Sequence, residues 1–451
     1  MRYLPHTDAE IAEMLSVVGR ASLDQLFDSV PESVRFRGDL KVPPALSEPA
    51  LMTHLQNLAQ ANTGAQLLSF LGAGAYDHHI PPAVDQLLLR GEFYTAYTPY
   101  QPEVAQGTLQ AIWEFQTMVS ELYGLPLANA SVYDGGSAAA EGAQMARRLT
   151  RREKIIVCHS VHPQYRDVVK TYLGPNAEYV EVPVSANGTT DLAALEKHLN
   201  DQAAAVLVGY PSFYGPYSDV RAVVSKAHDV GALVVACNSE PYALALAEAP
   251  GALGCDIAVG EGQPLACPPQ FGGPGVGLFA CRNDRNYLQQ LPGRLCGETV
   301  DNKGQRGYVL TLSTREQHIR RERATSNICT NQGLLALSFA IRVSLLGKRG
   351  FVEVATACHA KANYLRNQVA TLKGYSLAYT GQPYFNEFAI RVRGGNAAKV
   401  CQALEAQGII AGLDLGRIDP KQPDCLLIAV TEKHERESLD KFVKALDQVA
   451  A

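Results

Sequence analysis

Six short apolar runs constrain the fold of this 451-residue chain more than any other feature. They lie at residues 154–158, 179–184, 204–209, 232–237, 256–259 and 276–281. Most intervals between them hold an amphipathic stretch of helical length, as at residues 162–173, 191–199 and 219–230. Because the runs are continuously apolar rather than alternating, they indicate strands that are covered on both faces. The sequence therefore predicts an α/β fold with a mostly parallel sheet covered by helices.

The flanking parts of the chain have a different pattern. Residues 1–62 are polar and helical in pattern, with Thr7 as a predicted helix cap and Glu10 at the capping-box position. This segment is too short and too polar for a domain, so we expect an N-terminal helical arm that packs on another surface. Residues 331–451 combine helical stretches with two predicted strands, which indicates a smaller C-terminal α/β domain. Residues 63–330 then form the large α/β domain.

For the C-terminal part, the sequence predicts four helices and two strands. Helices are expected at residues 332–346, 350–372, 397–407 and 435–449, and strands at residues 387–392 and 425–430.

Composition excludes several classes of protein. The net charge of −5 provides no strong positive field, which argues against a nucleic-acid or membrane-surface protein. The ten cysteines occur without a CxxC pair, which is typical of reduced thiols packed as small apolar side chains. The sequence has no apolar targeting segment and no run of 18 apolar residues, so we expect a cytoplasmic protein.

One predicted loop lacks a lysine. Residues 256–280 read DIAVGEGQPLACPPQFGGPGVGLFA, and no lysine occurs between residues 227 and 302. A strand, a polar turn and a glycine-rich loop are where many pyridoxal-phosphate (PLP) enzymes carry the lysine that forms a Schiff base with the cofactor. Glu240 follows a predicted strand, where such an enzyme needs a carboxylate for the pyridine nitrogen. An ordinary acid at a strand end is an equally valid interpretation.

Two further segments have both a structural and a functional interpretation. Tyr94, Tyr97 and Tyr100 lie between prolines in a predicted non-helical loop before a helix that starts near residue 103. The residues alone favour a loop that packs on the domain over one that lines a polar pocket. Residues 133–141, YDGGSAAAE, open a predicted helix whose amides suit an anion. Because Asp134 would repel an anion there, ordinary helix capping is favoured.

Polar residues are concentrated in two other places. Residues 315–332 begin with mixed charges, typical of an exposed helix face, and end with hydroxyls and amides that suit caps or a polar contact surface. The histidines His78, His79, His159 and His162 lack a metal-binding context, so hydrogen-bonded histidines and no metal site are expected.

Several strings together resemble the glycine decarboxylase family, the P-proteins of the glycine cleavage system, within the fold-type I PLP-dependent superfamily. They are FYTAYTPYQPEVAQGTLQA, SVYDGGSAAAEG, QFGGPGVGLFA, LPGRL, TREQHIRRERATSNICTNQ and FNEFA. In this family the enzyme is one chain of two homologous halves or two separate chains, and the present chain resembles the N-terminal (alpha) half. Ala105 departs from the family pattern, where relatives tend to have serine.

The resemblance implies a role for the missing lysine. Counting back from the glycine-rich loop, Gln263 holds the position of the Schiff-base lysine, and Glu240 lies near the position of the pyridine carboxylate. An amide nitrogen is not a nucleophilic amine and cannot form a Schiff base. The resemblance therefore implies that PLP is bound by a partner, the beta subunit (subunit 2), rather than by this chain. Together they would decarboxylate glycine and transfer the aminomethyl group to the lipoyl arm of H-protein.

The resemblance also selects candidate site residues. Tyr97 and Tyr100 become the leading candidates for a contribution to the partner's active site. The candidates for the subunit interface are Gln101, Thr325, Ser326, Asn327 and Asn331. Two alternatives stay open: an independent PLP enzyme that uses another lysine such as Lys303, and a scaffold that stabilises the beta subunit without touching substrate.

Overall fold

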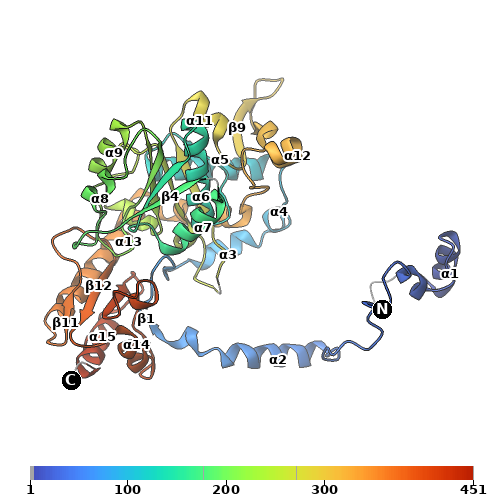
Figure 1. Ribbon diagram of the computed structural model, residues 1–451. Helices are drawn as coiled ribbons and strands as arrows, with labels where there is room; N and C mark the ends of the chain where they lie inside the picture. The colour runs from blue at the N-terminus through green and yellow to red at the C-terminus, as the bar shows by residue number, and fades with distance from the viewer. Residues whose placement is uncertain (1–4, 176, 271, 450–451) are drawn as a thin grey trace. The chain divides into compact units, whose positions relative to one another are not determined.

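The computed structural model describes residues 5–175, 177–270 and 272–449. By compactness the chain divides into two units, Met1–Ala65 and Gln66–Ala451 (Figure 1).

The N-terminal unit is a chain of helices without a core. Its elements are α1 (Asp8–Val17), η1 (Leu23–Phe27) and α2 (Glu48–Ala61), followed by η2 (Thr63–Gln66) at the boundary. The predicted capping box is confirmed, because Thr7 Oγ1 accepts from the Glu10 N–H at 3.3 Å and the Glu10 carboxylate accepts from the Thr7 N–H at 2.6 Å. None of these helices buries a residue. Isolated helices of such length are marginally stable in water.

The second unit is built on a seven-stranded sheet with the order β2-β8-β7-β6-β5-β3-β4. The strands are β2 (Leu127–Ala128), β3 (Lys154–Cys158), β4 (Glu178–Val182), β5 (Ala203–Gly209), β6 (Leu233–Asn238), β7 (Ile257–Glu261) and β8 (Gly277–Cys281). The pairs from β4 to β7 are parallel, whereas β8 pairs antiparallel with both β7 and β2. The predicted mostly parallel sheet is confirmed, and all six predicted strands exist within two residues of their expected bounds.

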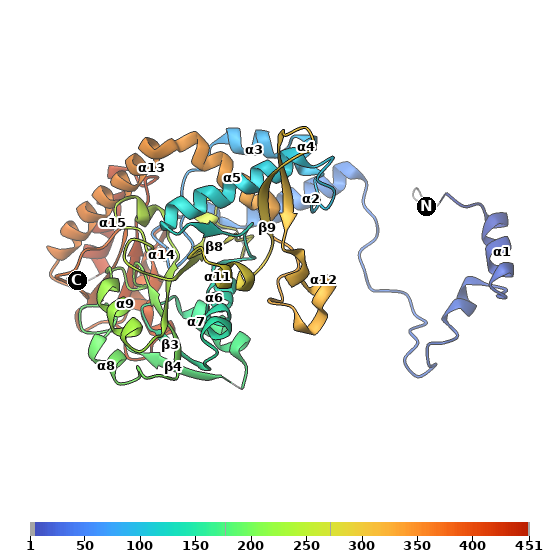
Figure 2. The ribbon, with the colours of Figure 1, turned by 90° about the horizontal axis from the view of Figure 1, so that it is seen from above.

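Successive side chains along the strands belong to two separate apolar cores. Ile156 of β3 and Val206 of β5 belong to one core, and their neighbours Ile155 and Ala205 belong to the other. Successive side chains of a strand point to opposite faces of the sheet, so the two cores lie on its two sides. Figure 2 shows α5 and α13 on one side and α6 and α7 on the other.

Helices and short strands connect and cover this sheet. The helices are α3 (Pro82–Leu88), α4 (Gly91–Tyr94), α5 (Gln106–Tyr123), α6 (Gly135–Thr150), α7 (Pro163–Leu173), α8 (Leu192–Glu196), α9 (Val220–Asp229), α10 (Gln263–Ala266), α11 (Arg285–Gln290), α12 (Gln317–Arg320) and α13 (Gly333–Ala370). The 3-10 turns are η3 (Pro241–Ala245), η4 (Ser313–Arg315) and η5 (Arg321–Arg323). Strands β9 (Leu295–Val300) and β10 (Arg306–Thr311) form an antiparallel hairpin. The two helices predicted at residues 332–346 and 350–372 are the halves of α13, which is kinked at Gly347, where φ is 58°.

The C-terminal part of the second unit has its own sheet, with the order β11-β12-β15-β14 and antiparallel neighbours. Its elements are β11 (Tyr375–Leu377), β12 (Glu387–Val392), α14 (Ala397–Glu405), β13 (Ile409–Ile410), β14 (Leu413–Asp414), η6 (Leu415–Arg417), β15 (Cys425–Ala429) and α15 (Arg436–Val449). Strand β1 (Leu68–Ser69) pairs with β13, and Phe70 lies in the core with Phe442, 4.1 Å between ring centroids. Residues 68–70, which the sequence placed in the large domain, therefore pack with this C-terminal part.

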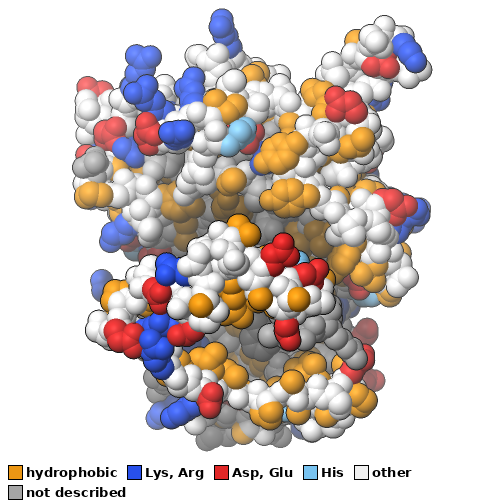
Figure 3. Space-filling model, turned by 90° about the vertical axis from the view of Figure 1, so that its right-hand side faces the viewer, with side chains coloured by type: hydrophobic (Ala, Val, Ile, Leu, Met, Phe, Trp, Pro, Cys, Tyr) orange, Lys and Arg blue, Asp and Glu red, His pale blue; other side chains and the backbone are white. Residues whose placement is uncertain are grey.

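The surface carries charged side chains of both signs, in agreement with the small net charge of the sequence. On the face drawn in Figure 3, Lys and Arg side chains lie among Asp and Glu and do not gather in one patch. Within the described ranges, no helix is both long and apolar enough to span a membrane.

Candidate functional site

A tyrosine-rich segment, residues 93–105, connects α4 to α5 on the surface of the second unit. Tyr94, Tyr97 and Tyr100 are all exposed, and 83% of the surface of Tyr97 is accessible. Pro99 and Pro102 lack the backbone N–H that a helix needs, which keeps this stretch irregular. Tyr94 is an exception to the expectation that the cluster is non-helical, because it ends the one-turn helix α4.

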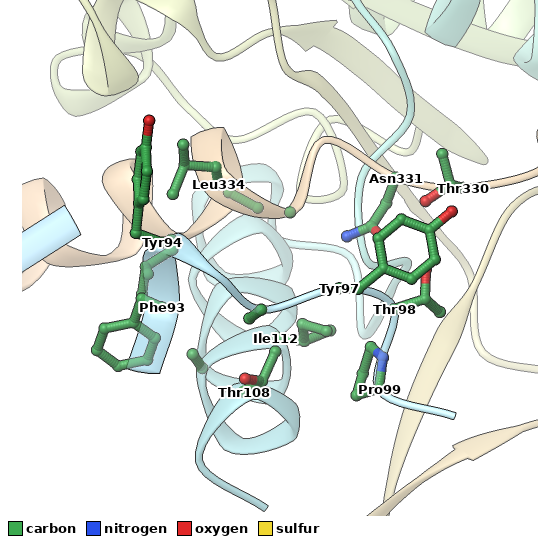
Figure 4. A pocket seen from close by; sticks show the side chains of 15 residues that line it. Phe93, Tyr94, Tyr97, Thr98, Pro99, Thr108, Ile112, Thr330, Asn331 and Leu334 are labelled. Atoms are coloured by element: carbon green, nitrogen blue, oxygen red, sulfur yellow. The ribbon is translucent and has the colours of Figure 1, made fainter. Parts of the chain in front are cut away.

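A cavity of about 280 Å³ lies between this segment, α5 and the start of α13. In Figure 4, Tyr94 and Leu334 stand at one end of the cavity, and Tyr97, Thr330 and Asn331 at the other. Gln101 lines a second, open cavity on the same segment, together with Tyr97. The structure thus brings Asn331 and Gln101, two of the predicted interface residues, to the tyrosine-rich segment.

The other predicted interface residues lie elsewhere. Thr325, Ser326 and Asn327 line an open cavity against α6 and α7. Ser326 Oγ donates to the buried carboxylate of Glu141 at 2.7 Å, and burial raises the pKa of that carboxyl group. These three residues and the tyrosine-rich segment therefore do not share one cavity.

Arg294 connects the two polar segments, and the sequence did not single it out. Its Nη2 donates to the Tyr100 hydroxyl at 3.0 Å and to the Cys329 carbonyl at 2.8 Å. The guanidinium group lies 5.0 Å from the centroid of the Tyr100 ring, a cation–π arrangement, and Nη1 is 3.7 Å from Glu316 Oε2. Arg294 is only 4% exposed. An arginine inside the apolar run LPGRLC was the available signal, because a buried arginine requires several partners.

A fourth cavity, of about 320 Å³, contains Gln263. Gln263 is 7% exposed, its Nε2 donates to the Cys267 carbonyl at 2.5 Å, and its Oε1 has no hydrogen-bond partner among the residues that the structure describes. The N-terminus of α6 and the loop residues 269–270 and 272–275 form part of the wall. The amide therefore lies inside a cavity at the carboxyl end of β7, where sheets of this kind bind ligands.

Carboxylates of this chain occupy the N-terminus of α6. Asp134 Oδ1 accepts from the Ser137 N–H at 2.7 Å in a capping box. Glu261 Oε2 accepts from the Gly135 N–H at 3.0 Å, and its Oε1 accepts from the N–H groups of Gln263 and Val276, each at 2.9 Å. Burial raises the pKa of Glu261 to about 7, although these three N–H donors favour the ionised form. Ordinary capping, which the sequence favoured at residues 133–141, is confirmed.

Glu240 does not line the cavity of Gln263. It caps η3, accepts from the Tyr242 N–H at 3.1 Å and lies 2.9 Å from His78 Nε2. The chain turns at the end of β6, so this carboxylate points toward the segment at residue 78 and toward Asn386. That Glu240 lies near the pyridine-carboxylate position therefore stays a prediction from the resemblance, and its observed side-chain contacts are with His78 and Asn386.

His78 is buried between two carboxylates. Its Nδ1 lies 2.6 Å from Glu432 Oε2, opposite the contact with Glu240. Burial alone would lower the pKa of His78, but the two carboxylates outweigh it and the pKa stands well above the usual value. The same contact lowers the pKa of Glu432 to about 2 against the effect of burial. Three side chains, those of His78, Cys358 and Glu432, bring atoms that could bind a metal within 4.8 Å of one another. Within this group, Cys358 Sγ donates to the Glu432 carboxylate.

The histidines of the sequence do not form one cluster. His159 lies 2.8 Å from Glu181, and His162 Nε2 donates to the Ala73 carbonyl at 2.8 Å. The backbone of His79 donates to Glu432. These contacts are those of hydrogen-bonded structural histidines.

The residues around Gln263 do not fit a bound pyridoxal phosphate. Position 263 provides no amine, and the backbone donors at Gly135 and Ser137 that would meet a phosphate are already satisfied by Glu261 and Asp134. Among the described residues that line the cavity, none is a lysine or an arginine. A phosphate would thus meet two carboxylates and no cation.

The strand order, the antiparallel β8 and a helix that begins beside a glycine-rich loop define the fold of the fold-type I PLP enzymes. The solved sphingosine-1-phosphate lyase of Burkholderia pseudomallei shares this fold, with a TM-score of 0.68 and 15% identity over 93% of this chain and 94% of that one. The chain belongs to the glycine cleavage system P-protein family, whose model matches residues 1–446.

Relatives within the family match over the full length. The chain is 60% identical to a probable glycine dehydrogenase (decarboxylating) subunit 1 of Sorangium cellulosum, with 99% of each chain covered. It is 49% identical to the protein of the same description from Geobacillus kaustophilus, with 99% of this chain and 98% of that one covered. A crystal structure of glycine decarboxylase (P-protein) of the glycine cleavage system, in inhibitor-bound form, superposes with a TM-score of 0.89 at 42% identity over all of both chains.

Proposed function

We propose that this chain is the alpha subunit of a two-chain glycine decarboxylase and carries no PLP of its own. The observation that supports this most directly is the surroundings of Gln263. The position lacks an amine, and Glu261 and Asp134 occupy the donors that a phosphate would need. The family uses PLP, so in this proposal the beta subunit (subunit 2) binds it and this chain is inactive alone.

In the proposed complex, PLP on the beta subunit serves as the electron sink for the decarboxylation of glycine. The remaining aminomethyl group passes to the lipoyl arm of H-protein. This chain excludes water from the partner's pocket and positions the substrate and the lipoyl arm. The cytoplasm remains the expected compartment.

The tyrosine-rich segment is the part of this chain that we assign to the partner's pocket. Tyr97 and Val104 are each 83% exposed, although apolar and aromatic side chains usually pack against protein. Arg294 holds the segment from within through Tyr100, so the exposed ring of Tyr97 is presented from a fixed support. Tyrosine and arginine are enriched among the residues that contribute most to protein interfaces.

The two alternatives fit less well. Lys303 lies in the exposed turn between β9 and β10 and is not among the residues around Gln263. An independent PLP enzyme built on Lys303 would therefore need a second cofactor pocket. In a pure scaffold, the exposed Tyr97 hydroxyl would have no catalytic role, so removing it would leave the reaction rate unchanged.

The test is reconstitution with the beta subunit and lipoylated H-protein, assayed by glycine-dependent exchange of labelled carbon dioxide. We expect exchange with both chains together and almost none with either alone. Absorbance between 330 and 430 nm, roughly the range of bound PLP, should follow the beta subunit only. A cofactor band in the purified chain that disappears in Lys303→Ala would support the independent enzyme instead.

A second comparison separates the pocket wall from the scaffold. We expect Tyr97→Phe to lower the exchange rate by about tenfold or more in an intact complex, in the range seen for loss of one positioning contact. Tyr364→Phe is the matched control, because that hydroxyl bonds to Asp440 on the far helix pair α13 and α15. Equal rates for Tyr97→Phe and wild type would leave only the scaffold role.

A further inference from the structure

Residues 129–133 connect β2 to α6 and contact the polar segment at residues 325–332. The Tyr133 hydroxyl accepts a hydrogen bond from the Cys329 N–H at 3.1 Å. The Cys329 carbonyl in turn accepts from Arg294 Nη2 at 2.8 Å. Both polar backbone atoms of the exposed residue Cys329 are therefore held by side chains that are distant in the sequence.

Ser131 has an unusual backbone conformation in this connection. Its φ is 90°, in a region that residues with a Cβ rarely adopt, and the residue is fully buried. The Ser131 N–H donates to Asn129 Oδ1 at 3.1 Å, and Ser131 Oγ accepts from the N–H of Gln332, the N-cap of α13, at 3.1 Å. Backbone strain of this kind persists only where the surroundings fix the residue, and it often occurs at functional sites.

Two further contacts fix the polar segment. Asn331 Nδ2 donates to the Ala130 carbonyl at 2.8 Å. Ile328 is only 2% exposed and lies in the same apolar core as Val132. The polar segment is thus fixed at its middle and at its end by the connection between β2 and α6.

The fixed segment forms one end of the cavity of about 280 Å³. Thr330 and Asn331 line this cavity together with Tyr97, and Figure 4 shows the three side chains at the same end. Binding residues are often carried by loops that a rigid scaffold positions. The hydrogen bonds to the polar segment therefore fix an accessible wall as well as part of the core.

We infer that Tyr133 and Ser131 are positioning residues for the reaction of the two-chain enzyme. They hold Thr330 and Asn331 beside Tyr97, so that the polar segment and the tyrosine-rich segment form one wall of the partner's pocket. The inference rests on the proposed function and adds to it the polar segment and the residues that fix it. It also gives the motif at residues 133–141 a role that needs no bound anion.

Tyr133→Phe removes the hydroxyl and leaves the ring in place. Amide hydrogen exchange of the full chain, followed by mass spectrometry on peptides that cover residues 325–333, measures the effect without the partner. We expect the Cys329 amide to exchange about tenfold faster than in wild type, because its N–H loses its acceptor. Tyr375→Phe is the matched control, because that buried hydroxyl donates to the Leu446 carbonyl in the C-terminal part and its loss should leave these peptides unchanged.

The reconstituted complex, at saturating glycine and beta subunit, measures the effect on the reaction. We expect Tyr133→Phe to lower glycine-dependent carbon dioxide exchange about fivefold with the KM for glycine within about twofold of wild type, because a displaced wall affects how the reacting groups are positioned. Ser131→Ala removes the acceptor of the Gln332 N–H and should act in the same direction. In a variant that already carries Tyr97→Phe, adding Tyr133→Phe should cost less than about twofold, because residues that act as one unit are not additive.

The proposed function and the inference fail in different ways. A wild-type complex without carbon dioxide exchange would overturn the proposed function and the inference with it. If the wild-type complex is active but Tyr133→Phe and Ser131→Ala react as fast as Tyr375→Phe, the inference alone is overturned. It is also overturned if the losses from Tyr97→Phe and Tyr133→Phe multiply in the combined variant.

Discussion

His78 is held between carboxylates that follow strands of two different sheets. Glu240 follows β6 of the large sheet and Glu432 follows β15 of the small one, so the imidazolium ion pairs with both parts of the second unit. Because the pKa of His78 is raised, its contribution to stability is fully present below its ordinary value of 6.5 and is lost as pH rises through the folded-state value. The pKa of Glu432 is lowered to about 2, so its contribution is present above 4.5 and is lost as pH falls toward 2.

We expect His78→Gln to lower the free energy of unfolding at pH 6 by about 3–5 kcal/mol, because two buried carboxylates lose their cation. Urea denaturation of wild type and variant measures the difference, which should narrow as pH rises past the raised pKa of His78. His159→Gln is the control: its partner Glu181 is exposed, so the cost should stay below about 1 kcal/mol. A His78→Gln cost that is constant from pH 6 to alkaline pH would contradict this account.

Arg294 is a buried residue that holds the tyrosine-rich segment in place. Its planar guanidinium donates two hydrogen bonds from Nη2, to Tyr100 and Cys329, while Nη1 lies 3.7 Å from Glu316, and a lysine ammonium provides no second nitrogen for that carboxylate. We expect Arg294→Lys to lower glycine-dependent carbon dioxide exchange by the reconstituted complex about tenfold, because the tyrosine-rich segment loses its support. The exposed Arg349, which pairs with Glu353 on α13, gives the control Arg349→Lys, which should be neutral. Equal losses for both variants would rule out a specific role for Arg294.

Some residue positions follow from local sequence and others do not. The Thr7 capping box and the Asp134 cap need only a few neighbouring residues, so the sequence predicts them. The position of Gln263 follows from its spacing to the glycine-rich loop. The orientation of the Glu240 side chain is set by its contact with His78, which lies 162 residues away in the chain. No local sequence pattern predicts such a contact.

At the scale of elements, two glutamines fasten the β9–β10 hairpin to α5. Gln116 donates to the Cys296 carbonyl at 3.0 Å and accepts from the Cys296 N–H at 2.9 Å. Gln106 makes the same pair of bonds with Tyr308 on β10, both at 2.9 Å. Each side-chain amide thus pairs with a strand residue as a neighbouring strand would. Since β9 begins next to Arg294, the hairpin also positions that residue.

We expect Gln116→Met to lower the free energy of unfolding by about 2–3 kcal/mol, because a buried N–H and a buried carbonyl both lose their partner. Gln110→Met on the exposed face of the same helix should change it by less than about 0.5 kcal/mol. Thermal or urea unfolding of the three proteins measures this. Similar stabilities for Gln116→Met and Gln110→Met would show that the paired bonds do not hold the hairpin.

The elements differ in how well the sequence predicts them. β3, β5 and β12 have near-continuous apolar runs, because both faces are buried, and their bounds are predicted within one residue. The β9–β10 hairpin is missed, because residues 298–300 and Arg306 are exposed and the strands lack such a run. Its strand pairing is stabilised by the side chains of α5, which are distant in sequence.

For the whole molecule, the sequence predicts the main parts of the fold but not every contact between distant segments of the chain. Composition and periodicity predict an arm, a parallel sheet and a smaller C-terminal α/β part. They do not place Phe70 in the C-terminal core, since that requires the parallel pairing of β1 with β13, more than 300 residues along the chain. The division into domains at residues 62 and 330 remains a proposal, because the structure groups Gln66–Ala451 as one compact unit.

The N-terminal unit exposes many large apolar side chains. They are Met14, Val17, Val18, Leu23, Leu26, Phe27, Val34, Phe36, Leu40, Val42, Leu46, Leu51, Met52, Leu55 and Leu58. On α2, Leu51, Leu55 and Leu58 have the spacing of a single helix face. Exposed apolar surface of this extent is typical of a protein contact. We propose that this face packs on the beta subunit.

The combined variant Leu51→Ser, Leu55→Ser and Leu58→Ser tests that contact. We expect its affinity for the beta subunit to fall about 100-fold or more, because two or more apolar anchors at about 1.4 kcal/mol each are lost. Its thermal unfolding should match wild type, since α2 buries none of its own residues. Sedimentation of the mixed chains measures the affinity, and Gln56→Ser with Gln60→Ser on the same helix is the control. If the leucine variant associates as tightly as the glutamine variant, the apolar face of α2 is not the contact, and the beta subunit must be held by other surfaces such as the tyrosine-rich segment.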